Sequence, residues 1–395
     1  MRTVQTLTSL SHLECSRCGQ WYDAFQLQSF STCCNKPLLV KYNGEDISRT
    51  VLKNRPANMW RYREMLPVLE DKNIISLGEG MTPLLSLKRT REKYGLSELL
   101  LKDEGQNPTG SFKARGLSAA ISKAKEFGID TCIIPTAGNA GGAMAAYCAV
   151  AGMNAIVVMP RHTPKMFKDE CELHGAEVIL VDGLISDCAR KVAEIKQTIE
   201  CFDISTLKEP YRIEGKKTMG YEIAEQLNWE LPDVILYPTG GGTGLIGMWK
   251  AFHEMIGLGW IENKLPRMIA VQAENCQPIV QTWKGNQPNA KNYVGKPSVA
   301  NGLAVPNPFG EDMILQVLKQ SGGLPIAISD EAMIKSVKQL GKDEGLLVAP
   351  EGGALLEALL VLMRKEVISP SEKIVLLNTG SAFKYLENIN ANERE

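Results

Sequence analysis

The chain has 395 residues, and at about 150 residues per domain this length favours two or three domains. Lys and Arg number 44 against 45 Asp and Glu, a net charge of −1, and no segment carries a long run of one sign. This balance excludes nucleic acid or an anionic membrane surface as a partner bound mainly through charge. With 44% hydrophobic and 23% charged residues, the composition is typical of a folded chain rather than a disordered one.

The N-terminal residues and most of the cysteines indicate the cytoplasm. The chain opens without the basic stretch and apolar core of a secretory signal. Of its ten cysteines, six stand singly, mostly in apolar or helical patterns, which is typical of buried free thiols in a reducing compartment. We therefore expect a cytoplasmic protein without a disulfide framework.

The other four cysteines lie near the start, in a segment that we expect to form a small β-rich knuckle over residues 1–45. Cys15 and Cys18 have the spacing of one half of a zinc ribbon. The second half lacks that spacing, because Cys33 and Cys34 are adjacent and a serine stands where the first cysteine of the pair would be. Bound zinc and a metal-free knuckle both stay open, and the sequence favours the metal-free form.

After a linker and one helix at 60–69, apolar strand segments alternate with helical segments to the end of the chain. The expected strands lie at 99–104, 131–138, 155–160, 177–183, 201–205, 233–242, 268–274, 324–329 and 373–380. The expected helices lie at 116–127, 139–151, 164–174, 186–200 and 217–227. This alternation predicts an α/β fold with mostly parallel sheets flanked by helices, and the strands are numerous enough for two lobes.

The most apolar stretch, 143–160, is long enough to raise the question of a membrane span. Gly152 and Asn154 divide it into an alanine-rich half and a β-branched half. This division predicts a buried helix leading into a buried strand.

In parallel sheets, ligands bind at the carboxyl ends of strands, so the turns there are the places to search. The first such turn, Pro-Thr-Gly-Ser-Phe-Lys-Ala-Arg-Gly, places Lys113 at the start of a helix. The helix dipole disfavours a cation there, so the amine loses its proton more easily and can attack a carbonyl carbon. The alternative is a solvated lysine at a helix start.

The second turn, after the strand at 233–242, is a run of glycines that leads into a helix. Successive backbone N–H groups can converge there on one anion, which predicts a phosphate-binding loop. Its residues are Gly240, Gly241, Gly242, Thr243 and Gly244. A tight packing turn is the alternative.

The same loop also contains a literal GxGxxG, formed by Gly242, Gly244 and Gly247, and Glu274 ends the next strand. This pattern keeps an NAD-dependent dehydrogenase as a remote alternative.

Two further turns complete the set. Thr136, Ala137 and Gly138 precede Asn139, whose amide can bond a ligand at the helix start or simply cap the helix. Thr379 ends the last strand, where its hydroxyl could meet a ring nitrogen.

From about residue 77 to 385, the four turns and their order resemble those of the fold-type II pyridoxal-phosphate enzymes, the tryptophan synthase β-like superfamily. The resemblance implies a large cofactor-binding lobe from 46–118 and 218–395, and a small mobile lobe from 119–217. It implies that Lys113 forms a Schiff base (aldimine) with pyridoxal 5′-phosphate, with Phe112 beside it. Asn139 would bond the 3′-oxygen, the glycine loop would hold the phosphate, and Thr379 would face the pyridine nitrogen. A hydroxyl there suits eliminations and replacements at Cβ and Cγ.

Within the superfamily, the chain is similar to threonine synthases in its cysteine-rich head and in the segment Pro-Tyr-Arg-Ile-Glu-Gly-Lys-Lys-Thr around Arg212. The similarity implies a lyase that converts O-phosphohomoserine and water to threonine and phosphate. Arg212, Thr136, Ala137 and Gly138 would contact the substrate, and a homodimer is common in the family. Ala137 and Ala140 stand where hydroxyl residues are usual, which keeps a serine/threonine dehydratase or related ammonia-lyase open.

Overall fold

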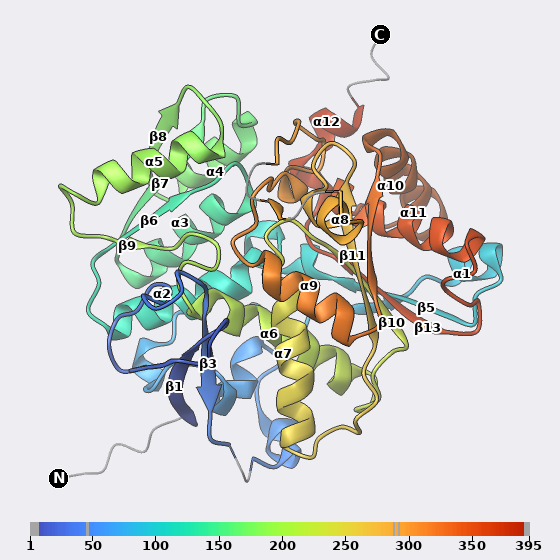
Figure 1. The fold of residues 1–395 in the computed structure, drawn as a ribbon, viewed down its shortest axis with the longest axis horizontal. Helices are drawn as coiled ribbons and strands as arrows, with labels where there is room; N and C mark the ends of the chain where they lie inside the picture. Colours follow the sequence, from blue (N-terminus) through green and yellow to red (C-terminus); the bar gives the residue numbers. More distant parts are fainter. Residues whose placement is uncertain (1–7, 45–46, 287–288, 291–292, 391–395) are drawn as a thin grey trace. The chain divides into compact units, whose positions relative to one another are not determined.

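The structure is a computed structural model that describes residues 8–44, 47–286, 289–290 and 293–390 (Figure 1). The chain forms two compact units. The first unit comprises Met1–Met81 and Lys113–Thr218, and the second comprises Thr82–Phe112 and Met219–Glu395. This division groups residues 46–81 with the first unit, whereas the resemblance implies a place for them in the large lobe. The lobe boundaries at 118 and 217 stay a prediction.

The first unit opens with a three-stranded antiparallel sheet in the order β2-β1-β3, as expected for the knuckle. Its strands are β1 (Leu10–Cys15), β2 (Trp21–Tyr22) and β3 (Leu38–Tyr42). Leu13, Leu38 and Val40 are buried on one side of this sheet.

The expected helix at 60–69 is wrong. The segment after the knuckle instead forms short 3-10 helices: η1 (Arg49–Asn54), η2 (Met59–Met65) and η3 (Asp71–Asn73). Helix η2 ends at Met65 because Leu66 is extended, with φ −121° and ψ 153°. Pro67 follows it, and a residue before proline is disfavoured in the helical region.

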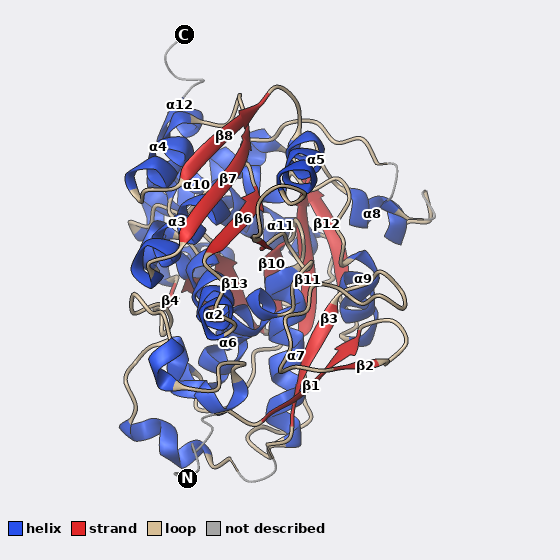
Figure 2. Cartoon of the chain, turned by 90° about the vertical axis from the view of Figure 1, so that its left-hand side faces the viewer, coloured by secondary structure: helices blue, strands red, loops and turns tan. Residues whose placement is uncertain are grey.

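The larger sheet of the first unit has four parallel strands in the order β8-β7-β6-β9. The strands are β6 (Thr131–Pro135), β7 (Asn154–Pro160), β8 (Glu177–Val181) and β9 (Phe202–Asp203). The helices are α2 (Lys113–Glu126), α3 (Asn139–Ala151), α4 (Lys165–Leu173), α5 (Ile185–Ile195) and α6 (Tyr211–Gln226), of which α6 runs on into the second unit. Helices α3 and α4 lie on one face of this sheet and α5 on the other (Figure 2). Right-handed crossovers require this arrangement, because the strand order reverses after β8.

The apolar stretch 143–160 is a buried helix followed by a buried strand, as predicted. Helix α3 ends at Gly152, whose left-handed φ of 71° closes the helix. Within the described ranges, no helix is both long enough and apolar enough to span a bilayer.

Helices α2 and α6 pack almost backbone to backbone in the first unit. A Cβ on Gly215 would lie 2.0 Å from the carbonyl oxygen of Arg115, and one on Gly116 would lie 2.9 Å from that of Arg212. Near this contact, Arg115 Nη1 donates to Thr218 Oγ1 at 2.9 Å. The sequence pattern gave no sign of this contact, which depends on two glycines nearly a hundred residues apart.

Gly215→Ala is expected to destabilise the protein by about 1–3 kcal/mol, because the clash is with backbone that cannot rotate away. Gly257→Ala is the matched control. Gly257 is the last residue of a helix, a Cβ there would meet nothing within 4 Å, and alanine should be neutral or slightly stabilising. Thermal and urea unfolding of both variants measure the difference. Equal stability of the two would contradict the close helix contact.

The second unit is built on a six-stranded sheet in the order β12-β11-β10-β13-β5-β4, parallel except for the edge strand β4. The strands are β4 (Leu84–Ser86), β5 (Glu98–Asp103), β10 (Val234–Pro238), β11 (Arg267–Ala273), β12 (Leu324–Ile328) and β13 (Lys373–Asn378). The α-helices are α1 (Lys88–Tyr94), α7 (Thr243–Gly257), α8 (Pro278–Trp283), α9 (Glu311–Gln320), α10 (Asp330–Glu344), α11 (Pro350–Arg364) and α12 (Leu386–Asn390). The 3-10 helices are η4 (Glu104–Gln106), η5 (Pro108–Gly110), η7 (Asn301–Leu303) and η8 (Ala382–Lys384). Strand β10 is buried along its whole length, as a parallel strand covered on both faces requires.

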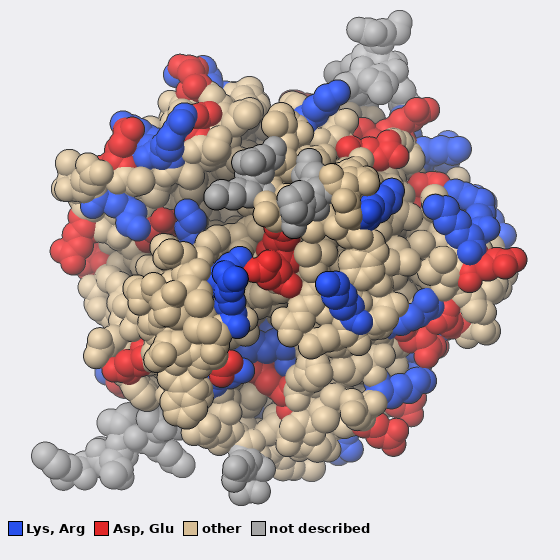
Figure 3. Space-filling model, in the orientation of Figure 1, with Lys and Arg blue, Asp and Glu red and all other residues tan. Residues whose placement is uncertain are grey.

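The predicted α/β class, with two mostly parallel sheets and a small cysteine-containing β knuckle, is confirmed. On the molecular face drawn in Figure 3, basic and acidic side chains are interspersed, and neither sign forms a broad patch among the described residues. This agrees with the even charge balance of the sequence.

Candidate active site

The glycine loop of the second unit connects β10 to α7. Gly242 is the residue before the helix and has a left-handed φ of +74°, which favours glycine. A Cβ on Gly240 would lie 2.3 Å from the carbonyl oxygen of Gly302, and one on Gly244 would lie 2.1 Å from Tyr237 Oη. The loop therefore needs glycines for its own packing, as the alternative reading expected. It also presents the N-terminal N–H groups of a 15-residue helix, which suit an anion such as a phosphate.

Thr379 and Phe112 lie at the same edge of this sheet. Strands β10 and β13 are parallel neighbours, so their carboxyl ends lie at the same end of the sheet. The glycine loop after β10 and Thr379 after β13 both follow these ends. The backbone N–H of Phe112 donates to the carbonyl oxygen of Thr379 at 3.1 Å. The Phe112 ring stands edge-on to Tyr237 of β10, with ring centres 6.2 Å apart. The second unit thus brings three of the predicted turns together.

Three buried polar atoms in or next to these turns have no hydrogen-bond partner among the described residues. They are the hydroxyl oxygens of Thr109 and Ser111 and Oδ1 of Asn378. Asn378 Nδ2 donates to Asp103 Oδ1 at 2.7 Å, so the other end of that amide is fixed in place. Buried polar atoms left without partners are what a polar ligand would satisfy. The strand ends therefore fit a ligand with a polar ring and an anionic tail.

Lys113 directly follows Phe112 and is the first residue of α2, at the position that the dipole argument requires. Lys113 also lies close enough to Lys216 to act on it electrostatically. Burial lowers the pKa of Lys216 well below its usual value, and the nearby charges of Arg212 and Lys113 lower it further. Three basic side chains are thus gathered in the first unit, and burial disfavours the charged form of Lys216.

Arg212 is fully buried near the start of α6. Its Nη1 donates to the carbonyl oxygen of Ile204 at 2.7 Å, whereas Nε and Nη2 have no hydrogen-bond partner within the described ranges. Glu209 accepts hydrogen bonds from the backbone N–H of Tyr211 at 2.7 Å and of Arg212 at 3.0 Å. Burial lowers the pKa of Arg212, and the charge of Glu209 opposes this. A buried guanidinium with two open donor nitrogens is suited to a phosphate or carboxylate.

Lys216 was missed in the sequence. It follows Arg212 by four residues on one helix, and such pairs lie on the same face. The four-residue spacing of Arg212 and Lys216 is visible in the sequence. It indicates a binding site only once both side chains are known to be buried. Sequence reasoning also missed Glu79, which is fully buried and accepts hydrogen bonds from Ser118 Oγ at 2.6 Å and Tyr147 Oη at 2.6 Å. Glu79 is fully engaged, so it braces α2 and α3 rather than offering a free base.

The turn after β6 carries the remaining predicted residues. Gly138 is the residue before α3, and Asn139 is the first helical residue rather than the helix cap. The Gly138 N–H donates to Thr136 Oγ1 at 3.2 Å, which shapes the turn, and Ala137 lies between them. The cofactor and substrate contacts of Thr136, Ala137, Gly138 and Asn139 stay predictions.

A family model described as "Pyridoxal-phosphate dependent enzyme" matches residues 75–380. Two relatives named threonine synthase, from Methanocaldococcus jannaschii and Methanosarcina acetivorans, are each 33% identical over 376 residues, or 94% of this chain and 92% of theirs. The family match includes the glycine loop, so the dehydrogenase alternative is wrong.

Solved structures share the fold. Diaminopropionate ammonia lyase from Escherichia coli has a TM-score of 0.68 at 19% identity, covering 88% of this chain and 93% of its own. Maize serine racemase has a TM-score of 0.64 at 22% identity, covering 76% and 89%.

Proposed function

Because the chain belongs to the family of pyridoxal-phosphate-dependent enzymes and matches relatives named threonine synthase over most of its length, we propose that it acts as a threonine synthase. The reaction would convert O-phosphohomoserine and water to threonine and phosphate. The observation that carries this choice of substrate is the pair of buried basic side chains, Arg212 and Lys216. The two open guanidinium nitrogens of Arg212 offer charge-assisted hydrogen bonds to a second phosphate, beyond the one on the cofactor.

Pyridoxal phosphate, when bound, supplies a conjugated ring that takes up the electron pair left at Cα and so allows a group at Cβ or Cγ to leave. In our proposal, the N–H groups of Gly240–Gly244 would hold its phosphate, Asn139 would bond its 3′-oxygen, and Phe112 would lie beside it. Thr379 would offer a hydroxyl to the ring nitrogen, which would leave that nitrogen largely unprotonated and suit elimination.

The Lys113 amine would hold the cofactor through its carbonyl carbon. With substrate bound, the same amine would take the protons from Cα and Cβ and return protons to Cγ and Cα. Arg212 and Lys216 would stabilise the phosphate that leaves Cγ. Water would supply the hydroxyl group at Cβ of threonine.

Lys216 is also relevant to the two alanines that stand where threonine synthases usually have hydroxyl residues. Ala137 and Ala140 supply no hydroxyl to a substrate phosphate, and this observation favours the second candidate, a serine/threonine dehydratase or related ammonia-lyase. Arg212 and Lys216 of α6 offset that loss of donors. A guanidinium binds a dianion more strongly than neutral hydroxyls do, and a nearby dianion favours the protonated form of Lys216.

The deciding experiment compares turnover of O-phosphohomoserine, serine and threonine by the purified holoenzyme. We expect release of inorganic phosphate with formation of threonine and without keto acid. Colorimetric phosphate and keto-acid assays measure the two products. Keto acid from threonine or serine, with no phosphate released from O-phosphohomoserine, would replace the proposal with the ammonia-lyase.

A further inference from the structure

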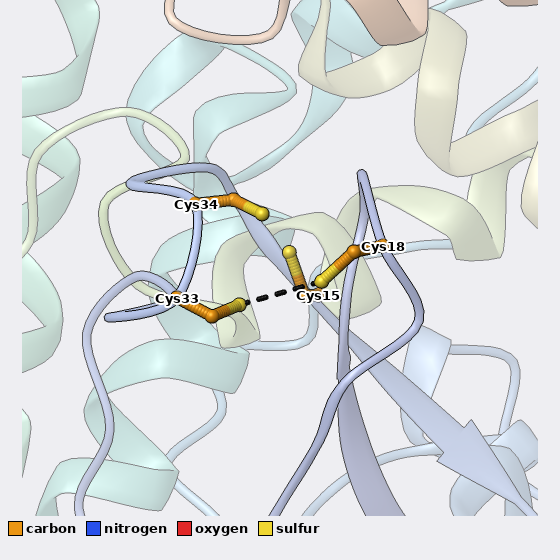
Figure 4. Close-up of side chains that lie close together, drawn as sticks. All are labelled: Cys15, Cys18, Cys33 and Cys34. Carbon is orange, nitrogen blue, oxygen red and sulfur yellow. Dashed lines mark hydrogen bonds between the residues drawn. The ribbon is translucent and has the colours of Figure 1, made fainter.

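The knuckle brings all four N-terminal cysteines to one point (Figure 4). Cys15 ends β1, Cys18 lies in the turn before β2, and Cys33 and Cys34 lie in the loop before β3. The four sulfur atoms all lie within 4.8 Å of one another, and those of Cys18 and Cys33 are 3.5 Å apart. Two loops separated along the chain thus present their thiols to each other.

These separations match a tetrahedral metal site. A zinc–sulfur bond of about 2.3 Å places the sulfur atoms of a regular tetrahedron about 3.8 Å apart. A disulfide instead requires about 2.05 Å between two sulfurs, and all four cysteines here are free thiols. Four sulfur atoms that are all close to one another can surround a single metal ion. Two disulfides would instead give two separate pairs of bonded sulfur atoms.

The loop before β3 accommodates adjacent cysteines through a tight turn. The N–H of Ser31 donates to the carbonyl oxygen of Lys36 at 2.8 Å, and the N–H of Lys36 returns to Ser31 Oγ at 3.0 Å. Asn35 within this turn has a left-handed φ of 51° and donates to the carbonyl oxygen of Ser31 at 2.9 Å. Ser31, at the position of the absent cysteine, therefore closes the loop that carries Cys33 and Cys34 rather than offering a ligand.

The turn after β1 is shaped around its sulfurs. Gly19 has a φ of 74°, and its N–H donates to the carbonyl oxygen of Cys15 at 3.0 Å. The turn thereby brings Cys18 back beside Cys15, so that both sulfur atoms belong to one cluster.

We propose that Cys15, Cys18, Cys33 and Cys34 bind one zinc ion as a structural site. Four sulfur ligands complete a tetrahedron and leave no open position for substrate or water, so the ion does not take part in the reaction. Borderline-soft zinc is favoured over magnesium or calcium by an all-thiolate set.

The knuckle is tied to the helix that carries the proposed phosphate-binding residues. Tyr42 Oη, at the end of β3, donates to Glu214 Oε2 of α6 at 2.8 Å. The ammonium of Lys217 pairs with Glu214 at 2.7 Å and lies 4.0 Å from the centre of the Tyr42 ring. Zinc that fixes the knuckle therefore also supports the first turns of α6.

The test is metal analysis of the full-length protein and two variants. Wild-type protein, purified under reducing conditions, should contain one zinc ion per chain, and cobalt(II) exchanged into it should give the visible bands of tetrahedral thiolate coordination. Cys18→Ser and Cys33→Ser should each lose the zinc. Cys201→Ser is the matched control, since Cys201 is also partly exposed in the first unit but lies outside the cluster, and should keep it.

A second measurement does not depend on folding of the variants. Titration of wild-type protein with an organomercurial should release the zinc in step with modification of four thiols, as a chromogenic chelator reports. Wild-type protein that takes up no zinc after reconstitution, a Cys18–Cys33 disulfide in reducing buffer, or zinc retained in both variants would each overturn the proposal. These measurements read zinc content and thiol state rather than turnover, so failure of this proposal is distinguishable from failure of the proposed function.

Discussion

Replacing Lys113 with alanine is expected to lower turnover by at least about 10³-fold, because in the proposed mechanism one amine would both hold the cofactor and move the protons. The variant should also lose the absorption of the protein-bound cofactor at about 420 nm that borohydride bleaches. Steady-state kinetics and absorption spectra of the purified variant measure both effects.

The matched control is Lys88→Ala. Lys88 is also the first residue of a helix, α1, but it is exposed to solvent. It should leave rate and spectrum unchanged. If the Lys113 variant behaved like the Lys88 variant, Lys113 would be the solvated helix-start lysine of the alternative reading.

Arg212→Lys and Lys216→Met are expected to lower kcat/KM for O-phosphohomoserine, by about tenfold to a hundredfold each, through loss of charge-assisted hydrogen bonds of about 1.5–3 kcal/mol. Lysine at position 212 keeps the charge but lacks the planar fork, so it tests geometry with little risk to folding. The effect should appear as a raised KM and as weaker inhibition by inorganic phosphate. Cofactor content, read from the absorption spectrum, should stay constant.

Lys217→Met is the control for the second experiment. Lys217 is the neighbouring buried lysine, but it pairs with Glu214, so its loss should lower stability and leave phosphate inhibition unchanged. Equal loss of activity toward serine and O-phosphohomoserine in the Arg212 and Lys216 variants would contradict a phosphate-specific role.

Local patterns in the sequence were enough for most of the fold. Gly152 divides an apolar run into α3 and β7, the wholly buried strand β10 is a continuous apolar segment, and β13 contains an apolar run at 374–377. The helix predicted at 60–69 is wrong because the prediction followed the spacing of the apolar residues and neglected Pro67. The residue before a proline disfavours the helical conformation, and the 3-10 helix ends at Met65.

Less of the candidate sites could be predicted from the sequence, because two of their features depend on how distant segments pack together. Lys216 became a candidate only through its burial beside Arg212, and burial is a property of the whole packed unit. The adjacent Cys33 and Cys34 departed from the zinc-ribbon spacing, and a left-handed turn at Asn35 was needed to direct them to one point. The cysteine spacing of a zinc ribbon assumes the usual turn between the two cysteines of a pair, so it does not apply to a loop with a different turn.

The close contact of α2 and α6 has a consequence for changing the substrate range by mutagenesis. Gly116 lies three residues after Lys113 and Gly215 three residues after Arg212, so the seam of glycines fixes the spacing of those two side chains. A library that varies positions 116 or 215 would mostly yield destabilised variants. Position 216 carries the same risk, because Lys216 is buried against Gly116. Diversity placed at 137 and 140, the positions proposed to face the leaving group, would leave this contact unchanged.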